Sequence, residues 1–278
     1  MVKIMTDTST LFSVAEGKAI GLTVVPLSVS LHDKTYREFE DIDTARFLDM
    51  LKDGSIPSSS QPSLGEIIDA YKSLDGHEVI NITIADGLSG TYRTAEQAKT
   101  MVSNEEDITV INSGTLCGPH RYVVQWALKM AEAGRQAKDI IDEVTEKLKH
   151  QVSFLMPMDF NFLRRGGRIT PLAAAMGSIL RFVPVLTQTV DGKRLERAGL
   201  SRNFAHALKV VLDKLAALGA GEGTLISVSH AGNPDKGDKA VQAVKERFPG
   251  AQVEFLTLSP AFVVQGGPGC IAVQMIRK

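Results

Sequence analysis

The stretch VINITIADGLSGTYRTAEQAKTMVSNEEDITVI, residues 79–111, decides the fold. It begins with the apolar, β-branched segment Val79–Ile84, passes through a polar loop into Thr91–Val102, and ends on a second apolar run, Ile108–Ile111. This order predicts a strand, a helix and a second strand. Strands that are joined by a crossover helix lie parallel, so the stretch predicts a parallel α/β sheet.

The same alternation extends over the first half of the chain. Val2–Met5 predicts a further strand, and Ser63 predicts a helix start because Glu66 stands at the third helical position, as in a capping box. The segment Lys138–Lys149 places its apolar residues on one stripe, which predicts a helix with a core face. We expect an N-terminal α/β/α domain with a parallel sheet over residues 1–150.

The second half predicts a different kind of sheet. Val183–Val190 and Arg194–Arg197 flank Asp191-Gly192, a dipeptide typical of tight hairpins. Further strands alternate with predicted helices, one of them capped by Asn203. A hairpin combined with strand–helix units predicts a two-layer α/β domain with a mixed sheet over residues 151–278.

Composition narrows the classes of partner. Hydrophobic residues make up 44% of the 278 residues and charged residues 23%, as in ordinary packed proteins. The formal net charge of −1 gives no electrostatic argument for nucleic acid or for an anionic membrane surface. The apolar runs are shorter than the ~20 residues that span a bilayer. We expect no nucleic-acid partner and no transmembrane segment.

The sequence favours a cytoplasmic location. The first residues, MVKIMTDTST, lack the basic start and apolar run of a signal peptide. Cys117 and Cys270 are the only cysteines and stand far apart in the sequence. Two buried thiols in a reducing compartment are the favoured interpretation, with a disulfide as the alternative.

Four polar loops stand where predicted strands end or predicted helices begin. Their residue types suit ligand binding better than packing, and in parallel sheets such loops gather at the carboxyl ends of the strands, where ligands bind. The four loops are Thr6–Ser9, Ser58–Ser63, Ala85–Tyr92 and Leu163–Ile169.

Two of these loops favour an anion. In the third loop, Gly90 permits close backbone approach, and the hydroxyls of Ser89 and Thr91 stand beside a helix N-terminus, which attracts negative charge. In the fourth loop, three arginines around two glycines can hold a carboxylate or a phosphate, with a solvated turn as the alternative. The first loop is explained equally well as a helix cap that uses Asp7 or Ser9.

Known motifs of catalysis and of cofactor binding are absent from the sequence. There is no G-x-x-x-x-G-K-[ST] loop, and Thr91 stands where the G-x-S-x-G motif requires its last glycine. The six histidines have neither the pairing nor the cysteine neighbours of a metal site. The residues therefore predict an anion-receiving α/β protein with hydroxyls, an arginine and no visible catalytic base, and with no metal or cofactor.

Five short motifs, in this order and spacing, resemble the DegV family over essentially the whole chain. They are Asp7–Ser9, Ser59–Ser63, Leu88–Tyr92, Gly166–Ile169 and Gly267–Gly269. The resemblance implies a parallel N-terminal domain, a mixed C-terminal domain and a long-chain fatty acid held between them. It also implies a carrier that is not an enzyme and has no catalytic residue, because the better understood bacterial members present the acid to a separate fatty acid kinase.

The resemblance implies a role for residues at matched positions. Hydroxyls of Ser59, where the family usually has Thr, and of Ser89 are expected to bind the carboxylate, with Arg168 supplying positive charge near the pocket mouth or a partner surface. The expected carboxylate-binding residues are Ser59, Ser60, Ser89, Gly90, Arg168 and Gln265. The expected acyl-chain pocket residues are Phe160, Phe162, Ile169, Met176 and Leu180.

Two positions depart from the family pattern. Gln265 stands where the family usually has His, and it can donate a hydrogen bond but cannot carry charge. Val183 stands where the family often has Lys. Both departures bear more on a kinase partner than on lipid binding. The alternatives are an enzyme acting on a carboxylate or phosphate substrate, like the dihydroxyacetone-binding kinase subunit of a related fold, and a structural or regulatory module with no ligand cavity.

Overall fold

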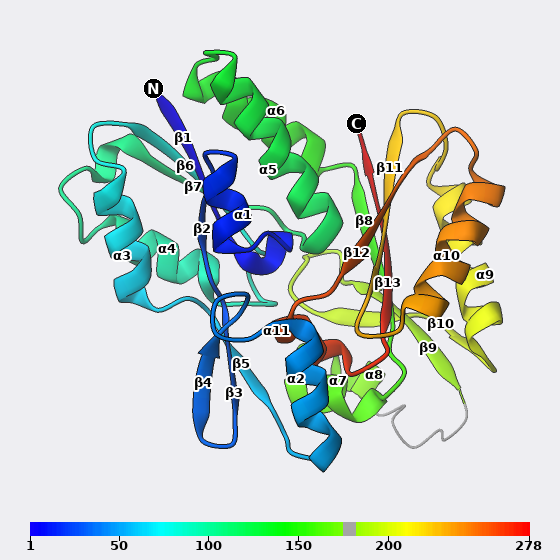
Figure 1. The fold of residues 1–278 in the computed structure, drawn as a ribbon. Coiled ribbons are helices and arrows are strands. Elements are labelled where there is room, and N and C mark those ends of the chain that lie inside the picture. Colours follow the sequence, from blue (N-terminus) through cyan, green and yellow to red (C-terminus); the bar gives the residue numbers. More distant parts are fainter. Residues whose placement is uncertain (175–181) are drawn as a thin grey trace.

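The computed structural model describes residues 1–174 and 182–278 (Figure 1). The N-terminal half contains a four-stranded sheet in the order β2-β1-β6-β7, and all of its neighbouring strands are parallel. Its strands are β1 (Val2–Asp7), β2 (Thr23–Val25), β6 (Glu78–Thr83) and β7 (Ile108–Asn112). The stretch that decided the fold forms β6, α4 (Thr91–Lys99) and β7, so the predicted parallel sheet is confirmed.

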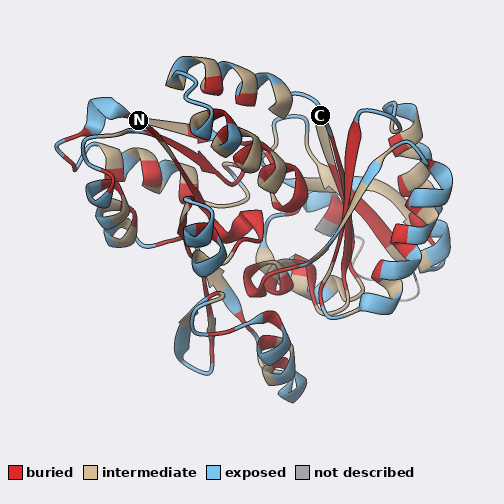
Figure 2. Ribbon diagram, turned by 45° about the horizontal axis from the view of Figure 1, so that its top comes forward, coloured by how far each residue is buried: buried red, intermediate tan, exposed pale blue. Residues whose placement is uncertain are grey.

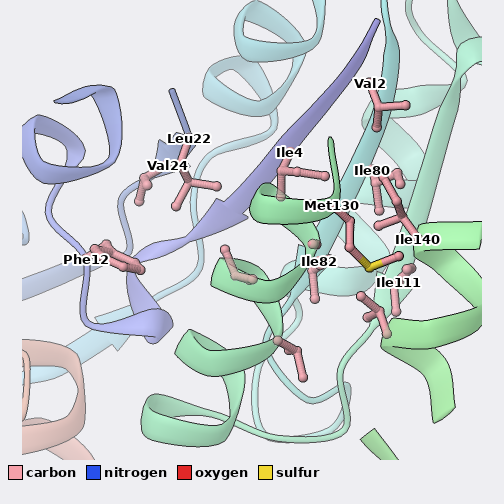
Figure 3. Close-up of a cluster of buried hydrophobic side chains, with 14 of the residues drawn as sticks. Val2, Ile4, Phe12, Leu22, Val24, Ile80, Ile82, Ile111, Met130 and Ile140 are labelled. Carbon is pink, nitrogen blue, oxygen red and sulfur yellow. The ribbon is translucent and has the colours of Figure 1, made fainter. Parts of the chain in front are cut away.

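Helices cover both faces of this sheet (Figure 1). On one face pack α3 (Leu64–Ser73) and α4, and on the other α5 (Cys117–Glu132) and α6 (Ala137–Leu148). Successive strand residues point to opposite faces, so Ile4 joins the core under α5 and α6 while Met5 joins the core under α3 and α4. Figure 3 shows Ile4 with Met130 of α5 and Ile140 of α6. The α/β/α arrangement is confirmed.

The C-terminal half contains a six-stranded mixed sheet in the order β10-β9-β8-β13-β11-β12. Only β11 and β12 pair in parallel. The strands are β8 (Gln151–Met156), β9 (Val183–Gln188), β10 (Leu195–Ser201), β11 (Thr224–His230), β12 (Gln252–Thr257) and β13 (Ile271–Arg277). The predicted mixed sheet is confirmed, and the Asp191-Gly192 turn joins two antiparallel strands as expected.

Helices α9 (Phe204–Ala217) and α10 (Pro234–Arg247) pack against one face of the mixed sheet. Figure 2 shows buried strands inside both halves and exposed residues on the outer surfaces of the helices. The opposite face of the mixed sheet turns toward the N-terminal half, where α5 packs on β11 and β13. This face is therefore where the two halves meet.

A small third sheet also links the halves. Its antiparallel strands, in the order β4-β3-β5, are β3 (Ser28–Leu31), β4 (Lys34–Arg37) and β5 (Ser58–Ser60). Helix α11 (Pro260–Gly266), near the C-terminus, packs on β3, β5 and α2 (Thr44–Met50). A shared core joins Val29 and Phe47 of the first half to Val263 of α11. This packing positions α11 beside the serine-rich strand β5.

The segment after β8 departs from the expected loop. Residues 160–166 form a helix, α7, because the Asp159 side chain accepts a hydrogen bond from the amide of Asn161 and caps it. Gly167 ends the helix with a φ of 70°, a conformation that glycine adopts without strain. The remaining helices are α1 (Val14–Ala19), α8 (Pro171–Ala174) and the 3₁₀ turns Thr8–Thr10, Leu51–Asp53 and Glu105–Asp107.

No strand in residues 1–174 and 182–278 pairs across residue 150. The division into domains at that residue stays a prediction. Within the same described ranges, no helix combines the length and the hydropathy needed to cross a bilayer.

Candidate functional site

A cavity of about 370 Å³ lies between the two halves of the chain. Its lining is mostly apolar and comes from the ends of N-terminal strands, from the inner face of the mixed sheet and from α11. The apolar lining includes Leu27, Ile84, Leu116, Leu155, Leu186 and Phe262. A concave, largely apolar space of this size with a few polar groups is typical of a small-molecule site.

The six residues expected to bind a carboxylate all line this cavity. They belong to four segments that are far apart in the sequence: β5, the loop before α4, the segment after α7, and α11. The residues are Ser59, Ser60, Ser89, Gly90, Arg168 and Gln265. The fold thus brings the predicted polar residues to one place, whereas their role toward a ligand stays a prediction.

A hydrogen bond across the two halves marks the polar end of the cavity. Pairing of β5 with β3 places Ser59 opposite Val29, and Gln265 Nε2 donates to Ser59 Oγ over 3.0 Å. The Gln265 amide passes close to α7, because a Cβ added to Gly166 would lie 2.1 Å from Gln265 Oε1. Glycine at position 166 therefore leaves room for the amide that joins α11 to β5.

The start of α4 contributes the second group of donors. Gly90 is the N-cap of α4 and has no side chain to cap the helix, and Ser89 Oγ accepts only a long hydrogen bond, 3.4 Å, from the Thr91 amide. Ser89 Oγ lies 2.8 Å from Thr91 Oγ1 at the same turn. A helix N-terminus with uncapped amides and nearby hydroxyls favours an anion.

Gln61 also lines the cavity, and the sequence analysis did not single it out. Its Nε2 donates to Thr94 Oγ1, and its Oε1 would lie 2.0 Å from a Cβ at Gly90. Gln61 thus lies directly over the start of α4. In the sequence, only the place of Gln61 in the serine-rich loop indicated a role at the site.

Arg168 is the one charged residue among the cavity-lining residues that the structure describes. Its side chain is exposed, and its guanidinium donates to the carbonyls of Leu88 and Gly166. No carboxylate side chain lines the described part of the cavity. Hydroxyls, amides and one guanidinium therefore make the polar end attractive to a negatively charged group.

The expected acyl-chain residues stay a prediction. Phe160, Phe162 and Ile169 are not among the described residues that line the cavity. Ile169 is buried beside Leu186, which itself lines the cavity, and Phe160 packs on the same cluster. The guanidinium of Arg165 lies over the ring of Phe162, with Cζ 4.8 Å from the ring centroid. The described apolar lining comes from other residues.

Two further expected acyl-chain residues, Met176 and Leu180, lie outside the described residues. Their part in the cavity stays a prediction.

Comparison with known proteins identifies the family. Residues 1–278 match the model of a family described as "Uncharacterised protein, DegV family". The chain belongs to the DegV family. A DegV domain-containing protein of Listeria innocua is 29% identical, and the match covers 98% of this chain and 97% of the relative.

Solved DegV structures resemble this chain over its whole length. DegV of Bacillus subtilis, described as a fatty acid binding protein, superposes with a TM-score of 0.87 at 25% identity, covering 100% of this chain and 99% of that one. A DegV family protein from Thermus thermophilus, described by its fatty acid binding, gives a TM-score of 0.86 at 25% identity with the same coverage. The DegV fold of the present chain is therefore shown.

Both cysteines of this DegV family member line the cavity. Cys117 and Cys270 are free and buried, as the sequence predicted. Burial raises the pKa of Cys270 to about 12 and raises the pKa of Cys117 well above its usual value. The two thiols are therefore protonated at neutral pH, which makes them part of the apolar wall and poor nucleophiles.

The first polar loop supports the site without lining it. The Asp7 carboxylate accepts hydrogen bonds from the amides of Ser9 and Ile84, each over 2.9 Å, and caps the 3₁₀ turn Thr8–Thr10. His120 is buried beside it, with Nδ1 2.9 Å from Ser9 Oγ, and burial lowers the pKa of this imidazole. The helix-cap interpretation of Asp7 is confirmed, and the cap fixes the backbone of Ile84 at the cavity wall.

Proposed function

We propose that this DegV family member binds one long-chain fatty acid in the cavity and carries it without transforming it. The observation that carries this proposal is the arrangement of the lining: Ser59, Ser89, Gly90 and Gln265 gather at one end of an otherwise mostly apolar space. A carboxylate at that end accepts hydrogen bonds, and the acyl chain lies along the apolar wall. Fatty acid binding by the relatives from Bacillus subtilis and Thermus thermophilus supports the proposal.

The acyl chain supplies most of the affinity. Burial of about fourteen methylene groups at ~0.8 kcal/mol each gives a gross driving force of about 11 kcal/mol. Loss of ligand freedom offsets part of this value. The hydrogen bonds at the head group therefore serve mainly to fix the orientation of the acid and to discriminate it from uncharged lipids.

Carrying suits this lining better than catalysis. Among the described lining residues there is no Asp, Glu or His that could act as a general base. The exposed Arg168 at the polar end offers a charged contact to a partner, so we propose that the acid is presented there to a separate fatty acid kinase. Gln265 serves as a neutral donor to the head group.

Ser89→Ala tests whether the polar end recognises charge. We expect the variant to bind a long-chain acid more weakly by about 1–3 kcal/mol, because the buried carboxylate loses a donor. Binding of the corresponding methyl ester is expected to change little. Titration calorimetry with both ligands measures the difference, and an equal loss for acid and ester would show that Ser89 only shapes the cavity.

Arg168→Ala tests the proposed delivery. We expect the affinity for the acid to stay within a few-fold and phosphorylation of the bound acid by a fatty acid kinase to be lost, because the guanidinium is exposed and bonded to backbone carbonyls. The control is Arg197→Ala, because Arg197 is an exposed residue of β10 that does not line the cavity. A loss of acid binding by about 1.5–3 kcal/mol would instead make Arg168 a carboxylate ligand.

A further inference from the structure

The cavity has a second polar group away from the Ser59 end. Ser153 of β8 and Gln274 of β13 are cross-strand partners, and both are buried and line the cavity. Gln274 stands three residues beyond Ile271 on β13, and this spacing corresponds to about 10 Å of strand leading away from α11 and Gln265. A ligand bound by its carboxylate at Ser59 therefore brings the middle or the far part of its chain to Ser153.

The hydrogen bonds around Gln274 leave one donor free. Gln274 Nε2 donates to Leu116 O over 2.9 Å and to Ser153 Oγ over 2.7 Å, and its Oε1 accepts from the Gly118 amide over 3.3 Å. Both amide hydrogens of Gln274 are thus used. Ser153 Oγ accepts one of them, and within the described residues its own hydrogen has no acceptor. This hydroxyl is held in place by Gln274 and remains able to donate into the cavity.

Two serines of the neighbouring strand β11 extend the pair Ser153 and Gln274 into a polar strip on the sheet. Ser227 and Ser229 of β11 pair with Gln274 and Ala272 of β13, so their side chains lie on the same face of the sheet. Both hydroxyl oxygens are buried and lack a hydrogen-bond partner within the described residues. Ser227 and Ser229 are not among the described lining residues, so of this strip only Ser153 and Gln274 reach the cavity. A site built only for hydrocarbon needs no such polar pair.

The strip is polar but uncharged. Leu116 and Cys117 adjoin it in the lining, and the described lining carries its only charged side chain, Arg168, at the other end. A second carboxylate here would be buried without a cation, which is costly. An acyl chain without an oxygen leaves the hydrogen of the Ser153 hydroxyl without an acceptor. A neutral oxygen on the chain satisfies this donor.

We propose that the cavity is selective for fatty acids that carry a hydroxyl group along the chain, and that Ser153 recognises this hydroxyl. The proposal rests on fatty acid binding in the same cavity and names the class of acid. Ser153 donates to the ligand oxygen, and Gln274 fixes the position of Ser153. The selectivity then depends on where the hydroxyl stands relative to the carboxylate.

Calorimetry with positional isomers tests the proposal. Delipidated full-length protein is titrated with octadecanoic acid and with monohydroxyoctadecanoic acids that carry the hydroxyl at successive positions in the middle and far part of the chain. We expect one position, or two adjacent ones, to bind about tenfold more tightly than octadecanoic acid, the effect of one buried hydrogen bond. Ser153→Ala is expected to remove this preference while octadecanoic acid keeps or gains affinity, and Ser153→Thr is expected to retain it.

Ser201→Ala is the matched control, because Ser201 is a buried serine of the same sheet that does not line the cavity. If octadecanoic acid binds and no hydroxylated isomer binds more tightly, the inference fails and the proposed function stands. The polar strip then holds water instead of a ligand hydroxyl. A preference that survives Ser153→Ala removes Ser153 from the recognition. If neither kind of acid binds, the proposed function fails and the inference fails with it.

Discussion

Ala272→Phe is expected to abolish retention of a long-chain acid while the protein stays folded. Ala272 lines the cavity from β13, opposite Leu155 of β8, which also lines it. A phenyl ring at this position enters empty space between the halves, so it replaces ligand and does not overpack the core. Exclusion of about five methylene groups costs about 4 kcal/mol, or roughly a thousandfold in affinity.

Titration of delipidated wild type and Ala272→Phe with a long-chain acid measures this loss. Ala217→Phe, which places the same ring on the exposed surface of α9, is the control. Circular dichroism shows whether each variant is folded. Unchanged affinity in a folded Ala272→Phe protein would mean that the acid binds somewhere other than this cavity.

Glu38 is expected to make the protein less stable as the pH rises toward neutrality. This carboxyl group is completely buried between the Thr8 hydroxyl and the amide of Ala261 in the first turn of α11, which both donate to it. Burial raises the pKa of Glu38 from 4.5 to about 7, against the lowering effect of these hydrogen bonds. Between these two pKa values the folded state binds more protons than the unfolded state, so the free energy of unfolding falls as the pH rises.

A shift of this size corresponds to about 3 kcal/mol. Glu38→Gln is expected to remove this slope, because glutamine stays neutral, accepts from the Ala261 amide and donates to Thr8. The wild-type melting temperature is expected to fall by roughly 5–10 °C more than that of the variant between pH 5 and pH 8, as followed by calorimetry without ligand. Glu222→Gln, at an exposed glutamate, is the control. Equal slopes in wild type and Glu38→Gln would contradict the buried-acid account.

The sequence predicted the polar end of the cavity better than its walls. Ser59, Ser89 and Gly90 stood out because small polar residues at strand ends are poorly explained by packing, and the fold brings them to one cavity. No comparable sequence pattern marks the residues of the cavity walls. Leu116 and Leu186 line empty space, yet in the sequence they are indistinguishable from residues of a solid core, because periodicity reports burial and not what fills the interior.

Two features of the structure were not predicted, for different reasons. The arginines and glycines of residues 163–169 predicted a loop, but Asp159 caps a helix over Phe160–Gly166 that includes the first part of this segment. Glu38 was not singled out, because a glutamate after a hairpin is usually exposed. Its burial depends on α11, more than two hundred residues later in the chain, and no local pattern encodes that contact.

Native mass spectrometry of the delipidated protein, reloaded with an equimolar long-chain fatty acid, tests the central claim most directly. The account predicts a single adduct with the mass of one acid per chain, lost in Ala272→Phe and kept in Ala217→Phe. A wild-type protein that takes up no acid, or that takes up several without saturation, would contradict one specific fatty acid site between the two halves.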